Sequence, residues 1–293
     1  METPKFYVEK LLNQYDSNIV NEIINGLNSK RKVTFRVNAL ISTKEEIEEI
    51  LKKENIKFKQ VSWYKDAFII EDKTENDLKT LEIYESGKIY LQSLSSMIPA
   101  IILDPKENEN ILDMCASPGG KTIQMACLSN NKSYITACER NKIRGEKLKY
   151  NLQKQKANRV NVMLEDARNL NDLFKFDKIL LDAPCSGSGT ENVFKKNFTE
   201  ELINKSSKTQ EALLKKALKI LKPGGTIVYS TCSILKEENE AILEKIKKEF
   251  KINIESIEIP KEIKLLPSKL NGVAVVVPNE LYEGFFIAKV IKK

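Results

Sequence analysis

Along the first 80 residues, segments with the helical spacing of apolar positions alternate with segments that have the spacing of strands. Helical periodicity marks the N-terminal segment and returns after Ser42 or Thr43, either of which precedes a run of glutamates and fits a helix-capping pattern. The predicted elements are a helical segment at 5–28, a strand at 32–40, a helix at 42–56 and one or two strands at 58–70. We therefore expect residues 1–84 to form a small N-terminal α+β domain.

From residue 85 onward, short apolar runs alternate with helical segments. Strands are predicted at 110–116, 133–139, 159–165, 176–182 and 226–232, with helices notably at 141–156 and 200–221 and two further strands at 272–278 and 284–291. Short turns between apolar strands and helices indicate a parallel, doubly wound, Rossmann-like sheet. Residues 85–293 are thus predicted to form an α/β domain whose ligands bind at the carboxyl ends of the strands.

Composition narrows the possible chemistry. The 293 residues contain no histidine, which excludes Ser-His-Asp hydrolysis, Cys-His proteolysis and histidine-based zinc sites, and no metal site is predicted. Five cysteines, an odd number without a CxxC pair, suit a reducing cytosol. No apolar run is long enough for a membrane span, and the charged N-terminal stretch lacks the apolar core of a secretory signal. We expect a cytoplasmic protein without membrane association.

The formal net charge of +7 is unevenly distributed, because the positive excess lies within residues 101–293. Basic residues gather in two stretches, 132–159 and 195–222, and the second contains eight lysines. Such stretches are either solvated helix faces or a surface that binds a polyanion. Charge alone does not separate these two interpretations.

The segment ILDMCASPGGKT (111–122) runs from an apolar strand through a Gly-Gly turn into a helix, and three kinds of ligand could suit it. A P-loop would need glycine where Cys115 stands, and Pro118 lacks one of the N–H groups that would bind phosphate. The dinucleotide fingerprint GxGxxG is absent as well. Both phosphate ligands are therefore disfavoured.

S-adenosylmethionine is the third candidate, since its carboxylate and amine need a tight glycine turn and its ribose needs an acid at the end of the next strand. Glu139 stands there, 19 residues past Gly120 and close to the expected spacing. Asp166 closes the following strand and is placed to meet the adenine amino group. Two acids in register after a glycine loop favour this cofactor.

Two cysteines form a second constellation at strand ends. Cys185 lies in DAPCSGSGT after the fourth strand, together with Asp182, and Cys232 lies in STCS at the end of the fifth. Methylation of carbon 5 of a pyrimidine requires a thiolate that adds to carbon 6 and an acid near the N3 edge that stabilises the adduct. A pair of thiols beside an aspartate meets this requirement. The other three cysteines are interpreted as inert buried thiols.

These motifs resemble those of the Sun/Fmu (RsmB/RsmF-type) family of RNA cytosine carbon-5 methyltransferases. The resemblance covers about residues 30–293 and is carried by RVN (36–38), CASPGGKT, Glu139, DAPCSGSGT, YSTCS and EGFFIA (283–288). It implies a class I methyltransferase fold with a small RNA-binding-like N-terminal domain. Ser117 stands where the family more often has alanine, a change that a loop should tolerate.

The resemblance also implies roles for individual residues. Cys232 would be the nucleophile, and Cys185 would assist release of the methylated product beside Asp182. The S-adenosylmethionine site would be lined by Cys115, Ala116, Ser117, Pro118, Gly119, Gly120, Lys121, Glu139, Arg144, Asp166 and Asp182.

We therefore expect a monomeric enzyme that transfers a methyl group from S-adenosylmethionine to carbon 5 of a cytosine in structured RNA, with ribosomal RNA favoured over transfer RNA. The target cytosine would have to leave its stack to reach Cys232. Two alternatives stay open: a P-loop-like NTPase, and a non-catalytic RNA-binding or ribosome-assembly module.

Overall fold

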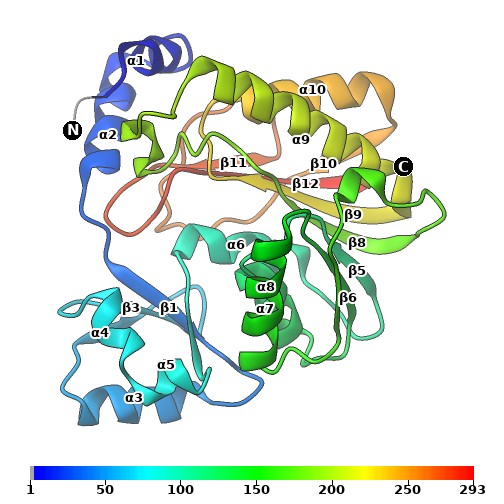
Figure 1. Cartoon of the computed structure of the whole chain (residues 1–293). Coiled ribbons are helices and arrows are strands. Elements are labelled where there is room, and N and C mark those ends of the chain that lie inside the picture. Colours follow the sequence, from blue (N-terminus) through cyan, green and yellow to red (C-terminus); the bar gives the residue numbers. More distant parts are fainter. Residues whose placement is uncertain (1–2) are drawn as a thin grey trace.

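Two sheets organise the chain, a small antiparallel sheet and a larger mixed one (Figure 1). The computed structural model describes residues 3–293, so predictions that reach back to residues 1 and 2 lie outside the described residues there. Within residues 3–293, every helix is too short or too polar to span a bilayer.

The small sheet has the strand order β2-β3-β1-β4, and each neighbouring pair is antiparallel. Its elements are β1 (Val33–Val37), β2 (Phe58–Gln60), β3 (Ala67–Ile70), β4 (Ile89–Leu91), α3 (Lys44–Lys53), α4 (Glu75–Lys79) and α5 (Glu82–Glu85). Thr43 caps α3 by accepting a hydrogen bond from the backbone N–H of Glu46, as one of the two predicted capping residues should. The stacked rings of Phe35 and Phe68 lie in the core that α3 covers.

The larger sheet has the order β10-β12-β9-β8-β5-β6-β7, and β11 also pairs with β12. Its strands are β5 (Asn110–Asp113), β6 (Tyr134–Cys138), β7 (Val160–Met163), β8 (Phe176–Asp182), β9 (Leu221–Thr231), β10 (Ile252–Glu255), β11 (Val273–Val276) and β12 (Phe285–Lys292). The run from β7 to β9 is parallel, whereas β12 is antiparallel to β9, β10 and β11. The predicted α/β class with a small N-terminal antiparallel unit is confirmed, and its parallel part holds the site.

Helices cover both faces of the larger sheet because its central strands are apolar on both sides. These helices are α6 (Leu94–Leu103), α7 (Gly120–Leu128), α8 (Lys142–Lys154), α9 (Glu200–Ile220) and α10 (Glu240–Glu249). Along β8, Leu180 packs in the core with α6, α7 and α8, while its neighbours Ile179 and Leu181 pack in the core with α9 and α10. Short 3₁₀ helices at Ala167–Asn169, Glu191–Phe194 and Lys236–Glu238 lie in the connections.

Two features extend across the predicted boundary between residues 84 and 85. β4 follows this boundary, yet it pairs with β1 and completes the small sheet. In the other direction, α1 (Lys5–Leu12) and α2 (Ser17–Asn28) pack on the larger sheet, where Tyr7 and Ile23 share a core with Phe286. Figure 1 shows both helices on the side of α9 and α10, away from the small sheet. The division into two domains at this position stays a prediction.

Candidate active site

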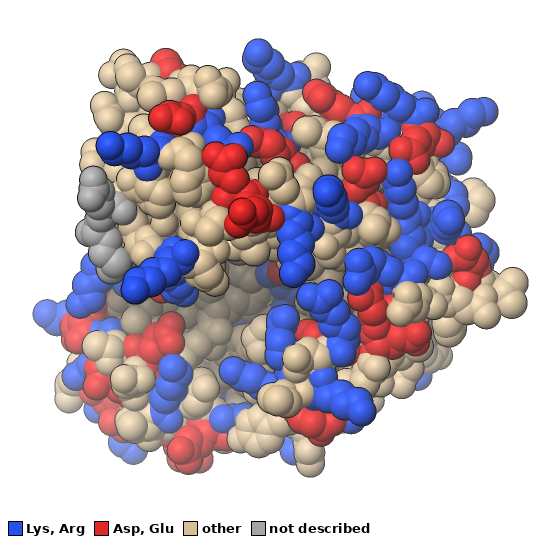
Figure 2. Space-filling view, turned by 45° about the horizontal axis from the view of Figure 1, so that its top comes forward, with Lys and Arg blue, Asp and Glu red and all other residues tan. Residues whose placement is uncertain are grey.

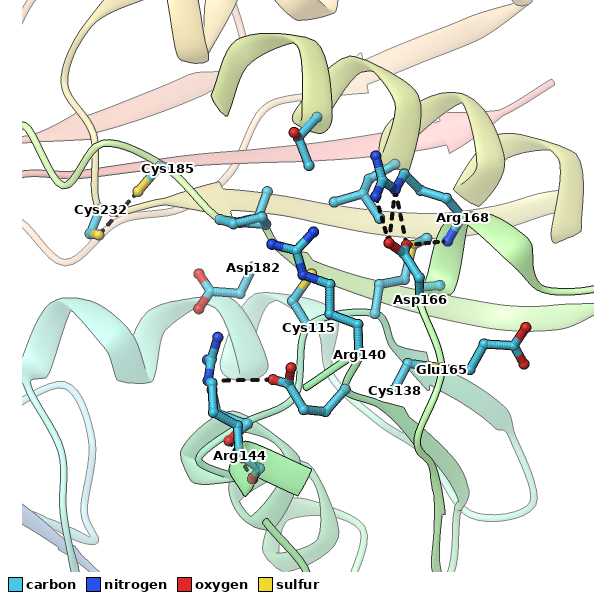
Figure 3. A pocket seen from close by; sticks show the side chains of 18 residues that line it. Cys115, Cys138, Arg140, Arg144, Glu165, Asp166, Arg168, Asp182, Cys185 and Cys232 are labelled. Carbon is cyan, nitrogen blue, oxygen red and sulfur yellow. Dashed lines mark hydrogen bonds and ion pairs between the residues drawn. The ribbon is translucent and has the colours of Figure 1, made fainter. Parts of the chain in front are cut away.

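Two adjoining cavities open at the carboxyl ends of the parallel strands. The first, here called the acidic cavity, carries Glu139, Glu165, Asp166 and Asp182 on its wall (Figure 3). The second, here called the Lys121 cavity, is lined among others by Tyr90, Gln92, Ser96, Lys121, Glu283 and Phe285. The residues common to both walls are Cys115, Ser117, Asp182, Ala183 and Cys232.

The glycine turn after β5 is built around the buried side chain of Asp113. Its Oδ1 accepts a hydrogen bond from the backbone N–H of Cys115 (3.3 Å), and its Oδ2 accepts one from the hydroxyl of Thr122 in α7 (2.7 Å). Burial raises the pKa of Asp113 to about 6, although the hydrogen bond from Thr122 opposes the shift. Gly119, the N-cap residue that precedes α7, has a φ of 112°, a left-handed conformation that favours glycine.

The turn presents most of its predicted residues to the cavities. Cys115 and Ser117 line both, and Ala116, Pro118, Gly120 and Lys121 line the Lys121 cavity. Gly119 lines neither, so its contribution is the shape of the turn. The loop thus lies between two spaces, and the assignment of residues 115–121 to the cofactor site stays a prediction.

The local geometry argues against the P-loop alternative. In a P-loop, the residues at the positions of Lys121 and Thr122 would hold phosphate oxygens and Mg²⁺. Here the Nζ of Lys121 instead forms an ion pair with Asp182 Oδ2 (2.8 Å) and donates to Ser96 Oγ (2.6 Å). Thr122 is fully buried, and its hydroxyl donates a hydrogen bond to Asp113. Neither side chain is directed at a phosphate site.

Glu139 follows β6 and lies in the acidic cavity, as predicted. Its side chain is 5% exposed, its Oε1 accepts a hydrogen bond from the backbone N–H of Asn141 (2.8 Å), and its Oε2 lies 3.6 Å from Nε of Arg144. Arg144 also donates through Nη2 to the carbonyl of Ser117 (2.9 Å). The pair thus connects the end of β6 to the glycine turn.

Asp166 also reaches the acidic cavity, but its carboxylate is already occupied. Arg168 donates to Oδ1 through its backbone N–H (3.0 Å) and Nε (2.9 Å), and to Oδ2 through Nη2 (2.5 Å). Figure 3 shows this ion pair on the side of the cavity opposite the cysteine pair. The hydrogen bonds from Arg168 lower the pKa of Asp166, which keeps the group ionised.

Cys185 and Cys232 meet because the strands that precede them are paired in register. β8 and β9 run parallel with Asp182 opposite Ser230, and the loops that leave them bring the two Sγ atoms to 3.1 Å. The hydroxyl of Ser230 donates to Asp182 Oδ1 (2.8 Å). In Figure 3, Asp182 lies between the cysteine pair and Cys115.

The cysteines differ in their capacity to ionise. The hydrogen bond with Cys232, followed by burial, raises the pKa of Cys185 well above the ordinary value, so Cys185 keeps its proton. Burial raises the pKa of Cys138 to about 12 and raises the pKa of Cys115 well above the ordinary value of a thiol. Cys127 donates to Asn38 Oδ1 (3.3 Å) outside both cavities.

The Lys121 cavity contains residues that spacing rules do not find. Tyr90 and Gln92 come from the end of the small sheet, and Ser96 comes from the first turn of α6. Glu283 and Phe285 belong to the EGFFIA motif. Hydrophobic periodicity predicts a strand at this motif but does not indicate that it lines a cavity. Segments far apart in the sequence therefore form this wall.

Comparison with known proteins places these features in a family. The family model described as 16S rRNA methyltransferase RsmB/F matches residues 100–291, and the ferredoxin-like domain of RsmF/B-like methyltransferases matches residues 3–76. A tRNA (cytosine(72)-C(5))-methyltransferase of Pyrococcus horikoshii is 39% identical over 218 residues, which cover 73% of this chain and 55% of that protein. Ribosomal RNA small subunit methyltransferase F of Shewanella oneidensis is 32% identical over 271 residues, which cover 88% of this chain and 57% of that protein.

Solved structures agree with these sequence matches. NSun6 from Pyrococcus horikoshii with SFG superposes with a TM-score of 0.90 at 26% identity, covering 99% of this chain and 98% of that one. A methyltransferase homologue from the same organism gives a TM-score of 0.81 at 30% identity, covering 99% and 100% of the two chains. The chain nevertheless spans little more than half the length of the two relatives named above.

Proposed function

The chain belongs to the RsmB/F methyltransferase family, and on this premise we propose that it transfers a methyl group from S-adenosylmethionine to carbon 5 of a cytosine in RNA. One observation carries the proposal: Cys232 lines both cavities, and its sulfur lies 3.1 Å from that of Cys185. A nucleophile in the common wall can face a base in one cavity and a methyl donor in the other.

The acidic cavity fits S-adenosylmethionine. Glu139 offers a buried carboxylate for the ribose hydroxyls, and Cys115 and Ser117 of the glycine turn line the wall where the polar end of the cofactor would lie. Asp166, oriented by Arg168, would lie toward the adenine. SFG, with which the NSun6 structure was solved, is an analogue of S-adenosylmethionine. When bound, this cofactor supplies an electrophilic methyl group.

The chain's own residues would activate the base in the Lys121 cavity. Cys232, as thiolate, forms a bond to carbon 6 of the cytosine, which places electron density on carbon 5 for methylation. Asp182, held by Lys121 and Ser230, faces the N3 edge, where charge develops. A base, either water or a carboxylate, then takes the proton of carbon 5, and the electron pair left behind re-forms the carbon 5–carbon 6 double bond as the Cys232 sulfur departs as thiolate. Cys185, which keeps its proton, assists at this release step.

Structured RNA is the proposed substrate, with ribosomal RNA favoured over transfer RNA because each of seven ribosomal relatives aligns over 88% of this chain or more. Figure 2 shows that the molecule is hollowed near the middle of one face, with lysine and arginine side chains along the rim. Such a rim suits a phosphate backbone. Cys185 and Cys232 must remain free thiols for this chemistry, so we place the protein in the reducing cytoplasm.

A direct test is methyl transfer by the purified chain. The protein is incubated with isotopically labelled S-adenosylmethionine and with ribosomal or transfer RNA, and the digested nucleosides are analysed by mass spectrometry. Labelled 5-methylcytidine is expected with wild type and not with Cys232→Ala. Cofactor binding without any labelled cytidine would favour the non-catalytic RNA-binding module instead.

A further inference from the structure

A buried carboxylate lies behind the cysteine pair and contacts the residue after each cysteine. Glu238 is fully buried in the 3₁₀ helix Lys236–Glu238. Its Oε1 accepts a hydrogen bond from the backbone N–H of Ser186 (2.8 Å), and its Oε2 accepts from the hydroxyls of Ser186 (2.6 Å) and Ser233 (2.7 Å). Ser186 directly follows Cys185, and Ser233 directly follows Cys232.

A third element fixes the other side of Cys185. Gln210 of α9 donates through Nε2 to the carbonyl of Pro184 (2.9 Å) and reaches Glu238 Oε1 at 3.4 Å. Pro184 directly precedes Cys185. Ser186, on one side of Cys185, is therefore hydrogen-bonded to the Glu238 carboxylate, and Pro184, on the other side, is hydrogen-bonded to Gln210.

Further hydrogen bonds join the two cysteine loops around Glu238. The hydroxyls of Ser188 and Ser233 are 2.7 Å apart, and the backbone N–H of Gly189 donates to the carbonyl of Cys232 (2.9 Å). The phenol of Tyr7 in α1 donates to the carbonyl of Ser188 (2.6 Å). The loops are thus held on the side away from the cavities.

Glu238 itself lines neither cavity, so it does not touch the reacting atoms. Burial raises its pKa, while the hydrogen bonds from Ser186 and Ser233 lower it. Burying a carboxylate is costly unless it is well hydrogen-bonded, and an apolar side chain could fill the space. What an apolar side chain could not do is accept hydrogen bonds from both loops at once.

We propose that Glu238 is a positioning residue whose carboxylate sets the distance between the sulfurs of Cys185 and Cys232. One consequence rests on the proposed function: release of the methylated product requires the two thiols at this distance. The spacing itself can be measured without RNA or cofactor.

The first experiment measures how readily the two thiols combine. The folded protein is equilibrated with oxidised and reduced glutathione, so that the dithiol and oxidised glutathione give the Cys185–Cys232 disulfide and two reduced glutathiones. The disulfide is quantified by peptide mass spectrometry, which separates it from products of the other cysteines. Glu238→Ala should lower the equilibrium constant at least tenfold, whereas Glu238→Gln, which retains an acceptor for Ser186 and a partner for Ser233, should stay within threefold of wild type.

Two further variants control for folding. Ser129→Ala removes a buried hydroxyl that pairs with Ser133 (2.7 Å) outside the cavity walls, and it should leave the equilibrium constant unchanged. Ser233→Ala removes one donor to Glu238 and should lower the constant three- to tenfold even if Glu238→Ala does not fold. A folded Glu238→Ala or Ser233→Ala variant with the wild-type constant would overturn the proposal.

The second experiment tests the catalytic consequence in protein that methylates RNA. Glu238→Ala should lower kcat at least tenfold and lower KM for RNA with it, leaving kcat/KM nearly unchanged, because a slower release step lets covalent protein–RNA adduct accumulate. An unchanged kcat beside a lowered thiol equilibrium would overturn the role in release. If wild type methylates no RNA, the proposed function fails, and the thiol equilibrium still decides whether Glu238 sets the spacing.

Discussion

At the scale of single residues, Asp113 couples the glycine turn to pH. Its pKa of about 6 exceeds the ordinary value of 3.8 because the group is buried, so between these values the native state binds more protons than the unfolded state. The contribution of Asp113 to stability is therefore largest at low pH and declines as pH rises through 6.

Asp113→Asn should remove this pH dependence. The free energy of unfolding of wild type minus that of the variant should fall by roughly 2.4 kcal/mol between pH 4 and pH 7, a figure that follows from the two pKa values. Urea denaturation at several pH values measures it. Taking the difference cancels the other titrating groups, and a difference that does not change with pH would contradict the assignment.

The two cavities should respond differently to single substitutions. Glu139→Gln in the acidic cavity should weaken S-adenosylmethionine binding by about 10- to 100-fold, the effect of losing hydrogen bonds to a charged acceptor. Lys121→Met in the other cavity should change that affinity less than threefold but lower methyl transfer by about 100-fold, because Asp182 loses its partner. Calorimetry and single-turnover rates provide the two readouts. A large loss of cofactor affinity in Lys121→Met would show that the cofactor binds in the Lys121 cavity, against the assignment to the acidic cavity.

Sequence reasoning found the candidate residues at strand ends but not their partners. Glu139, Asp166, Asp182, Cys185 and Cys232 could be placed because strand ends in a parallel sheet share one edge. The ion pairs of Asp166 with Arg168 and of Asp182 with Lys121 depend on side-chain conformations that no spacing reveals. Glu238 was missed for the same reason, since it acts from behind the site.

At the scale of secondary structure, backbone contact joins the loop that follows β8 to the residue that precedes β12. Gly189 and Gly284 touch, and a Cβ added at Gly189 would lie 2.0 Å from the carbonyl oxygen of Gly284. No side chain can be accommodated there unless the loops separate.

Gly189→Ala should therefore be much more destabilising than Gly224→Ala. A Cβ at Gly224 would meet no atom within 4 Å, so its substitution should cost only about 1–2 kcal/mol for the left-handed backbone at φ of 73°. Gly189→Ala should lower the free energy of unfolding by about 3 kcal/mol or more, because backbone cannot move aside as a side chain can. Equal losses in urea denaturation would show that the loops are not in contact.

Elements with strong periodicity were predicted closely, and elements set by tertiary pairing were not. The helix predicted at 200–221 is Glu200–Ile220, and that predicted at 141–156 is Lys142–Lys154. β9 begins at Leu221, before the predicted residue 226, because its pairing with β8 starts at Phe176. β10 is only Ile252–Glu255 and was not predicted, and the antiparallel direction of β12 follows from its partners rather than from its own pattern.

At the scale of the whole molecule, the small sheet is joined to the site by Arg36. This side chain is fully buried and donates to the carbonyl of Gly120 (3.1 Å) and to Gln92 Oε1 (3.0 Å). Next to it, a third cavity separates the small sheet from α8 and shares Tyr90, Leu91 and Pro118 with the Lys121 cavity. The proposed RNA substrate, once in the Lys121 cavity, would therefore also lie near α8.

Reversal of charge on α8 should weaken RNA binding. Lys147, Tyr150 and Lys154 lie on one face of the helix and line this third cavity, and the ion pairs of α8 within the described residues involve Arg144 and Lys149 instead. The double variant Lys147→Glu and Lys154→Glu should lower RNA affinity by about tenfold or more at 0.1 M salt and reduce the salt dependence.

The matched control reverses two lysines of α3, Lys52 and Lys53, which lie outside all three cavities. This variant has the same change in net charge, so it corrects for general electrostatic attraction. Equal loss of RNA affinity in both variants, measured by fluorescence anisotropy over a salt series, would show that α8 makes no particular contact.

Cys232 as nucleophile and Cys185 as the residue that assists release should behave differently when a covalent protein–RNA complex is trapped. Cys185→Ala, Cys232→Ala and wild type are each incubated with substrate RNA and S-adenosylmethionine, and protein–RNA species that survive denaturing electrophoresis are quantified. We expect a stable adduct with Cys185→Ala, none with Cys232→Ala, and little with wild type, which turns over. An adduct formed by Cys232→Ala, or full methyl transfer without the sulfur of Cys232, would contradict these roles.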